Sequence, residues 1–174
     1  MRLQLEEFWH LTQIGLRSTV PTVVTLFLVI ICVLPYGVPG LNKAVPLLPI
    51  VSIYFWSVHR PDLTSLTCHF LIGLFQDIVV GTPIGFSAAI FVGIHAAVHY
   101  QRRFFYGRTF IVLWASFSLL MFAVSMLSFM IMGLYNLSFV PFSPVFLQFF
   151  LTVAFYPLLI RILQWISRAF LRPV

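Results

Sequence analysis

Charged side chains are scarce in this sequence. Asp, Glu, Lys and Arg make up 8% of its 174 residues, whereas 61% of the residues are hydrophobic and the mean hydropathy is +1.05. A chain this apolar is not a water-soluble domain, and its length allows no more than one compact unit. We therefore expect an all-α integral membrane protein with a single polytopic domain over residues 1–174.

Cysteine is also nearly absent. Cys32 and Cys68 both fall within apolar runs, and their separation matches neither a metal-binding motif nor a disulfide-bonded framework. We interpret both as small buried hydrophobic residues.

Acidic residues number only four against ten Lys and Arg, which gives a formal net charge of +6. In a soluble protein this excess would indicate a nucleic-acid partner. Here the basic residues are spread over the short segments between apolar runs, which is the distribution that orients a protein in a membrane. The predicted partner of these charges is the lipid bilayer, and nucleic-acid binding is not expected.

Long apolar runs fill most of the chain, and proline, glycine and basic residues divide them into six. We expect transmembrane helices at about residues 20–35, 44–58, 63–80, 84–100, 109–135 and 145–166. Pro157 lies inside the last run, where membrane helices tolerate proline. Residues 1–18 mix apolar and charged side chains and predict a cytoplasmic segment lying on the membrane surface.

Six spans place both termini on the same side of the membrane, and the basic residues indicate which side. With a cytoplasmic N-terminus, Lys43 is the one basic residue outside. The arginines inside or near the inner surface are then Arg2, Arg17, Arg60, Arg102, Arg103, Arg108, Arg161, Arg168 and Arg172. Both termini are therefore predicted to be cytoplasmic.

Two of the four carboxylates lie in one stretch, residues 60–85. Asp62 precedes the third apolar run and is expected to cap its helix. Asp77 lies inside that run, where an unpaired charge costs a few kcal/mol. Three roles are open for Asp77: a proton or ion relay, a hydrogen-bonded anchor for the turn at residues 81–83, or part of a ligand or partner site. The anchor is favoured, since no second carboxylate lies within a span.

On both sides of that turn, residues spaced by four share one helix face, and these faces carry small residues. His69, Gly73, Asp77 and Gly81 share one face of the third predicted helix, and Gly85, Ala89, Gly93 and Ala97 share one face of the fourth. Such stripes allow membrane helices to pack closely. We expect the third and fourth helices to pack together along these stripes, with a partner-binding face as the alternative.

The sequence offers little that could carry chemistry. A pair of carboxylates for acid–base catalysis is absent, and no serine or histidine lies in a recognisable nucleophile turn. His95 and His99 have helical spacing but no third ligand that the sequence places beside them. We therefore predict neither an enzyme nor a metal or cofactor site.

The order R-P-D, G-x-x-x-D and P-x-G on a hydrophobic chain of this length resembles the rod shape-determining protein MreD family. The motifs comprise Arg60, Pro61, Asp62, Gly73, Asp77, Pro83 and Gly85. The resemblance implies a multi-pass scaffold or regulator in the bacterial inner membrane that is not an enzyme. It also implies binding to MreC within the elongation machinery, or elongasome, alongside MreB, RodA and its transpeptidase partner, in support of lateral peptidoglycan synthesis and regulation of rod cell shape.

This family is also similar in architecture to the six-helix substrate-binding components of energy-coupling-factor vitamin transporters. A solute-binding transporter component is therefore the alternative function. Those components dock through an Ala-x-x-x-Ala stripe on their first helix, whereas residues 20–35 of this chain contain no alanine. That departure favours the scaffold.

Overall fold

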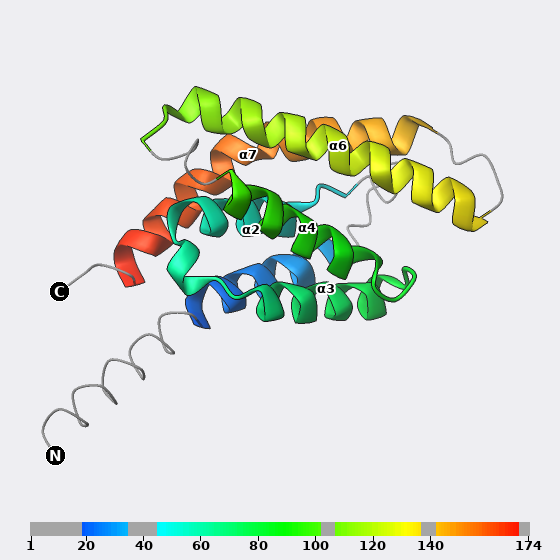
Figure 1. The fold of residues 1–174 in the computed structure, drawn as a ribbon, viewed down its shortest axis with the longest axis horizontal. Helices are drawn as coiled ribbons and strands as arrows, with labels where there is room; N and C mark the ends of the chain where they lie inside the picture. Colours follow the sequence, from blue (N-terminus) through cyan, green and yellow to red (C-terminus); the bar gives the residue numbers. More distant parts are fainter. Residues whose placement is uncertain (1–18, 35–44, 102–106, 137–141, 171–174) are drawn as a thin grey trace, which may run out of the picture.

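A computed structural model describes residues 19–34, 45–101, 107–136 and 142–170. Within these ranges the chain forms six α-helices, one short 3-10 helix and no strand (Figure 1). The α-helices are Thr19–Val33, α2 (Leu48–His59), α3 (Leu66–Val80), α4 (Phe86–Tyr100), α6 (Phe110–Asn136) and α7 (Phe142–Phe170), and the 3-10 helix η2 is Pro61–Leu63. The all-helical class expected from the sequence is confirmed.

Each predicted span overlaps one of these helices, and most of the ends differ by a few residues. The second helix begins at Leu48, four residues later than expected, because Pro46 and Pro49 confine it to a start with proline in its first turn. The predicted surface segment 1–18 and the basic residues Lys43, Arg102, Arg103 and Arg172 lie outside the described residues.

Two helices, α6 and α7, are long and apolar enough to cross a membrane, and the other four are shorter apolar helices. With 27 and 29 residues, α6 and α7 extend over about 40 Å, more than the roughly 30 Å hydrocarbon core. The 12 residues of α2 cover only about 18 Å. Six membrane-spanning segments therefore stay a prediction.

The central element is α2, which is apolar on every side. Its residues from Pro49 to Ser57 are all buried, as expected of a helix without a polar face. It packs against α4 and α7, while α3 covers α4 and α6 lies along α7 (Figure 1). The core thus forms around the shortest helix.

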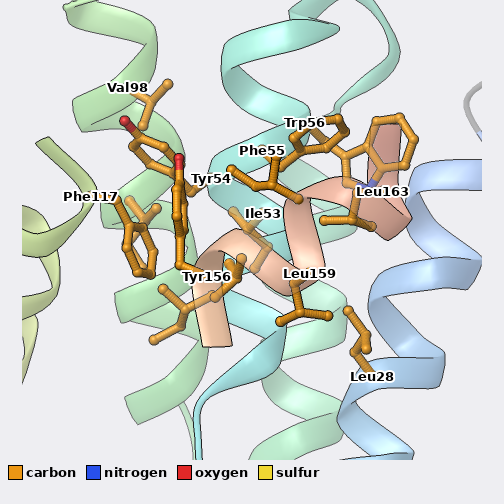
Figure 2. Close-up of a cluster of buried hydrophobic side chains, with 14 of the residues drawn as sticks. Leu28, Ile53, Tyr54, Phe55, Trp56, Val98, Phe117, Tyr156, Leu159 and Leu163 are labelled. Carbon is orange, nitrogen blue, oxygen red and sulfur yellow. The ribbon is translucent and has the colours of Figure 1, made fainter. Parts of the chain in front are cut away.

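Aromatic side chains join α2 to the two long helices. Tyr54 of α2 lies edge-on to Phe117 of α6 at 5.3 Å between ring centroids, and Phe117 stacks on Tyr156 of α7 at 4.5 Å (Figure 2). The Tyr54 hydroxyl donates a hydrogen bond to the Leu113 carbonyl of α6 at 3.1 Å. Burying these large rings supplies much of the packing between the layers.

The proline within α7 is matched by a contact from α6. Pro157 has no N–H to donate, so the carbonyl of Val153, four residues earlier, loses its helical partner. The indole Nε1–H of Trp114 donates to that carbonyl at 3.3 Å. The helix therefore continues through Pro157, as expected from the sequence, and the freed acceptor ties α7 to α6.

Candidate functional site

The candidate site is the hairpin that joins α3 to α4. Gly81 ends α3 with a φ of 77° and Gly85 precedes α4 with a φ of 97°. Both lie in the left-handed region that favours glycine. The residues between them, with Pro83 at the centre, turn the chain within a few positions.

The side chain of Asp77 holds this hairpin together. One carboxylate oxygen, Oδ1, accepts the Thr82 hydroxyl at 2.7 Å and the Ser87 N–H at 2.9 Å. The other, Oδ2, accepts the Gly85 N–H at 2.8 Å and the Ser87 N–H at 3.2 Å. The carboxylate thus satisfies amides at the start of α4, where the helix dipole also favours a negative charge.

The main chain of Asp77 binds the same turn, since its carbonyl accepts the N–H groups of Gly81 and Thr82 at 2.9 and 3.1 Å. Asp77 is 0% exposed, although Gly81 and Ile84 in the turn that it binds are exposed. Within the described residues, the hydrogen bonds to the carboxylate come from Thr82, Gly85 and Ser87 of the hairpin. This geometry is that of an anchor, and it leaves the carboxylate little capacity for a solute.

Gly73 sets the distance between α3 and α4. A Cβ atom at this position would lie 2.3 Å from the Ala88 Cα and 2.6 Å from the Ala88 N, both of them backbone atoms. Only glycine permits this approach. Gly73 and Asp77 therefore act on the same contact between α3 and α4: Gly73 permits the close approach, and Asp77 fixes the end of the contact at the hairpin.

The Arg60-Pro61-Asp62 segment forms the corner between α2 and α3. Arg60 closes α2 through its N–H, which donates to the Trp56 carbonyl at 2.8 Å, and Pro61 begins η2. The chain is extended at Thr64, and α3 begins only after Ser65. Asp62 is exposed in η2 and precedes this N-cap by three positions, so the predicted cap at Asp62 is wrong.

The predicted packing of the small residues of α4 against α3 is also wrong. Ala89, Gly93 and Ala97, here called the α4 stripe, are exposed, and nothing lies within 4 Å of a Cβ built on Gly93. A four-residue spacing places residues on one face of a helix, but it does not determine which helix that face contacts. The contact between Gly73 and Ala88 directs a different face of α4 towards α3. Gly81 is likewise exposed in the turn and does not pack.

The α4 stripe instead lines an open apolar groove between α4 and α6, of about 500 Å³. The α6 wall consists of residues from Leu120 to Ile131, and every lining residue is apolar. We refer to this feature as the α4–α6 groove. It begins at Pro83 of the hairpin and runs along α4 to Ala97.

Three histidines meet on the other side of α4. The His69 ring of α3 lies 4.8 Å from the His95 ring, and His95 lies 6.1 Å from His99. Ser57 of α2 is 3.1 Å from the His95 Nδ1. His69 is a third histidine in this cluster, which the sequence did not place beside His95 and His99. Even so, no group of His, Cys, Asp or Glu in the described part of the chain is arranged to hold a metal ion.

Sequence reasoning missed Thr82 and Ser87, which both donate to Asp77. Their positions on either side of Pro83 and Gly85 are the available signal, because hydroxyl-bearing residues favour turns and helix starts. Sequence reasoning also missed the α6 residues that line the groove, although the regular spacing of Leu120, Val124, Leu127 and Ile131 is visible in the sequence.

Comparison with known proteins gives one clear result. No curated protein and no solved structure matches the chain, so the similarity to the vitamin-transporter components stays a prediction. The model of one family, described as rod shape-determining protein MreD, matches residues 12–166, which is most of the chain. This is a family of membrane proteins involved in rod shape determination, and the chain belongs to it.

Proposed function

We propose that the protein is a multi-pass scaffold or regulator of the elongation machinery in the bacterial inner membrane. In this role it binds MreC, works in a larger complex with MreB, RodA and the transpeptidase partner of RodA, and supports lateral peptidoglycan synthesis and rod shape. It acts through contacts with other proteins and does not turn over a substrate.

Family membership supports this role. The main structural observation in its favour is that the carboxylate of Asp77 is hydrogen-bonded within its own hairpin. The one carboxylate within the predicted spans is taken up by the hydroxyl and amides of its own hairpin. Its function there is to fix α4 against α3, which gives a rigid pair of helices. A rigid helical surface is suited to holding partner helices.

The alternative is a solute-binding component of a vitamin-type transporter. The α4–α6 groove is large enough for a small molecule, since ligand pockets measure roughly 300–1,000 Å³. Such pockets nevertheless contain a few polar groups that orient the ligand, whereas every residue lining this groove is apolar. The groove therefore favours an apolar occupant over a vitamin with polar groups.

The test is co-purification in nanodiscs from cells that also express an epitope-tagged MreC, followed by mass spectrometry of proteins and small molecules. We expect MreC in a fixed ratio to the protein and no stoichiometric solute. Recovery of a bound vitamin-like molecule without MreC would replace the scaffold with the transporter component. A parallel shape-rescue assay in cells depleted of the protein links binding to rod shape.

A further inference from the structure

A small cavity lies where the first helix, Thr19–Val33, meets the corner between α2 and α3. Its lining comes from that helix, from the corner at η2 and from the first two turns of α3. The space open to the centre of a water molecule is about 10 Å³. One water needs roughly 10–15 Å³ by this measure. The cavity therefore has room for a single water and excludes a larger solute.

This cavity is polar, unlike the α4–α6 groove. The hydroxyl-bearing residues that line it are Thr22, Thr25, Thr64 and Ser65, and an imidazole comes from His69. The Thr64 hydroxyl donates to the Pro61 carbonyl at 3.2 Å, so its oxygen keeps lone pairs that can accept another hydrogen bond. Among the described residues, no Asp, Glu, Lys or Arg lines the cavity. The lining thus suits a neutral polar molecule and not an ion.

The His69 ring has an unused hydrogen-bonding atom at this cavity. His69 is 5% exposed, and its Nδ1 has no hydrogen-bond partner among the described residues. The Ser65 carbonyl, one turn earlier, accepts the main-chain N–H of His69 at 3.3 Å and makes no hydrogen bond to the ring. A buried polar atom without a partner is costly, so such atoms are usually paired with protein or with water.

The neighbouring histidine does not supply this partner. The rings of His69 and His95 lie 4.8 Å apart at their centroids with 32° between their planes. A hydrogen bond to an imidazole nitrogen lies in the plane of the ring, so a neighbour that lies over the ring face cannot form it. The Nδ1 of His95 is instead 3.1 Å from the Ser57 hydroxyl.

We propose that the cavity binds one ordered water molecule, which hydrogen-bonds to the His69 Nδ1 and to hydroxyl oxygens of Thr64 and the first helix. Buried waters make about three hydrogen bonds to polar groups that otherwise lack a partner. Ser65 is exposed and also part of the lining, so water can enter at the α2–α3 corner. The bound water joins three elements, and this role goes beyond the proposed function.

The test is water-edited solid-state NMR in lipid bilayers, in which magnetisation passes from water to nearby side chains. The protein carries isotope-labelled histidine and tryptophan, and His69→Phe and Trp56→Phe assign the two signals. Trp56 is the matched control, because its indole Nε1 is also buried without a partner among the described residues. It belongs to the hydrophobic core and does not line the cavity (Figure 2). We expect early transfer from water to the His69 ring and none to Trp56.

Two substitutions of Cys68 check that the water lies in this cavity. Cys68 lines the cavity and is half-buried. Cys68→Leu adds enough volume to displace one water, so we expect loss of the His69 signal. Cys68→Ser has a similar size and leaves the cavity open, so the signal should remain. If Cys68→Leu does not fold, the comparison of His69 with Trp56 in the unsubstituted protein still decides the question.

Each other outcome overturns the proposal. No transfer to His69 in the unsubstituted protein would mean that the cavity is dry or filled by another group. Equal transfer to His69 and Trp56 would mean that water enters the core in general. A signal that persists in Cys68→Leu would place the water elsewhere. None of these outcomes affects the binding of MreC, which co-purification tests separately.

Discussion

At the scale of single residues, the charge of Asp77 is tolerated because of where its hydrogen bonds originate. The Thr82 hydroxyl and the amides of Gly85 and Ser87 all reach the carboxylate from within ten positions along the chain. Both carboxylate oxygens thus accept hydrogen bonds from donors that the hairpin itself supplies. The cost of a buried charge is thereby offset without a basic partner.

Two substitutions of Asp77 should separate the contribution of its hydrogen bonds to stability from the contribution of its charge. Asp77→Ala leaves the Gly85 and Ser87 amides without their acceptor, and we expect a loss of about 3 kcal/mol of stability. Asp77→Asn keeps one acceptor oxygen and should lose about half as much. Thermal unfolding in detergent and rescue of rod shape measure the two effects, and full activity of both variants would contradict an anchoring role.

Gly73 offers a second test at residue scale. In Gly73→Ala the new methyl group would meet the backbone of Ala88, so α3 and α4 must separate, at a cost of about 1–3 kcal/mol. Gly93→Ala is the matched control, because open space surrounds that position and alanine favours a helix by up to about 1 kcal/mol. Unfolding temperatures that fall equally in both variants would show that the close approach at Gly73 is unimportant.

At the scale of helices, the bond between Trp114 and Val153 should depend on Pro157. Trp114→Phe removes a hydrogen bond worth about 1 kcal/mol. In Pro157→Ala the new amide can donate to the Val153 carbonyl, so the same Trp114→Phe change should cost less there, by about 0.5–1 kcal/mol. A double-mutant cycle on unfolding free energy measures this coupling, and strictly additive effects would rule it out.

The sequence predicted these helices well because hydrophobic runs and proline breaks are local signals. The turn predicted at residues 81–83 is likewise a local signal, because Gly81, Thr82 and Pro83 leave room only for a tight connection. The face that α4 directs towards α3 was not predictable, because the four-residue spacing of the α4 stripe is compatible with any neighbouring helix. The close approach of Gly73 to Ala88 determines that face. The cap expected at Asp62 failed for a similar reason, since Pro61 starts a 3-10 turn that delays α3.

At the scale of the whole molecule, the ends of the helices sort into two groups. The start of Thr19–Val33, the corner between α2 and α3, the start of α6 and the end of α7 lie at one end of the bundle (Figure 1). Arg60 follows α2, Arg108 precedes α6 and Arg168 lies in the last turn of α7. Three of the four arginines of the described chain thus belong to the end that the positive-inside rule assigns to the cytoplasm, and Arg161 lies about two turns of α7 before Arg168. The hairpin at residues 81–85 lies at the opposite end.

This arrangement predicts how two introduced cysteines react with a membrane-impermeant maleimide in spheroplasts. In a parent protein carrying Cys32→Ser and Cys68→Ala, Ile84→Cys should be labelled without permeabilisation, because Ile84 is 80% exposed at the hairpin end. Ser65→Cys, exposed at the corner before α3, should be labelled only after permeabilisation. The opposite labelling pattern would mean that the protein has the opposite orientation in the membrane. Labelling of both sites in intact spheroplasts would mean that α3, only 15 residues long, does not separate the two sides, because its roughly 22 Å fall short of the hydrocarbon core.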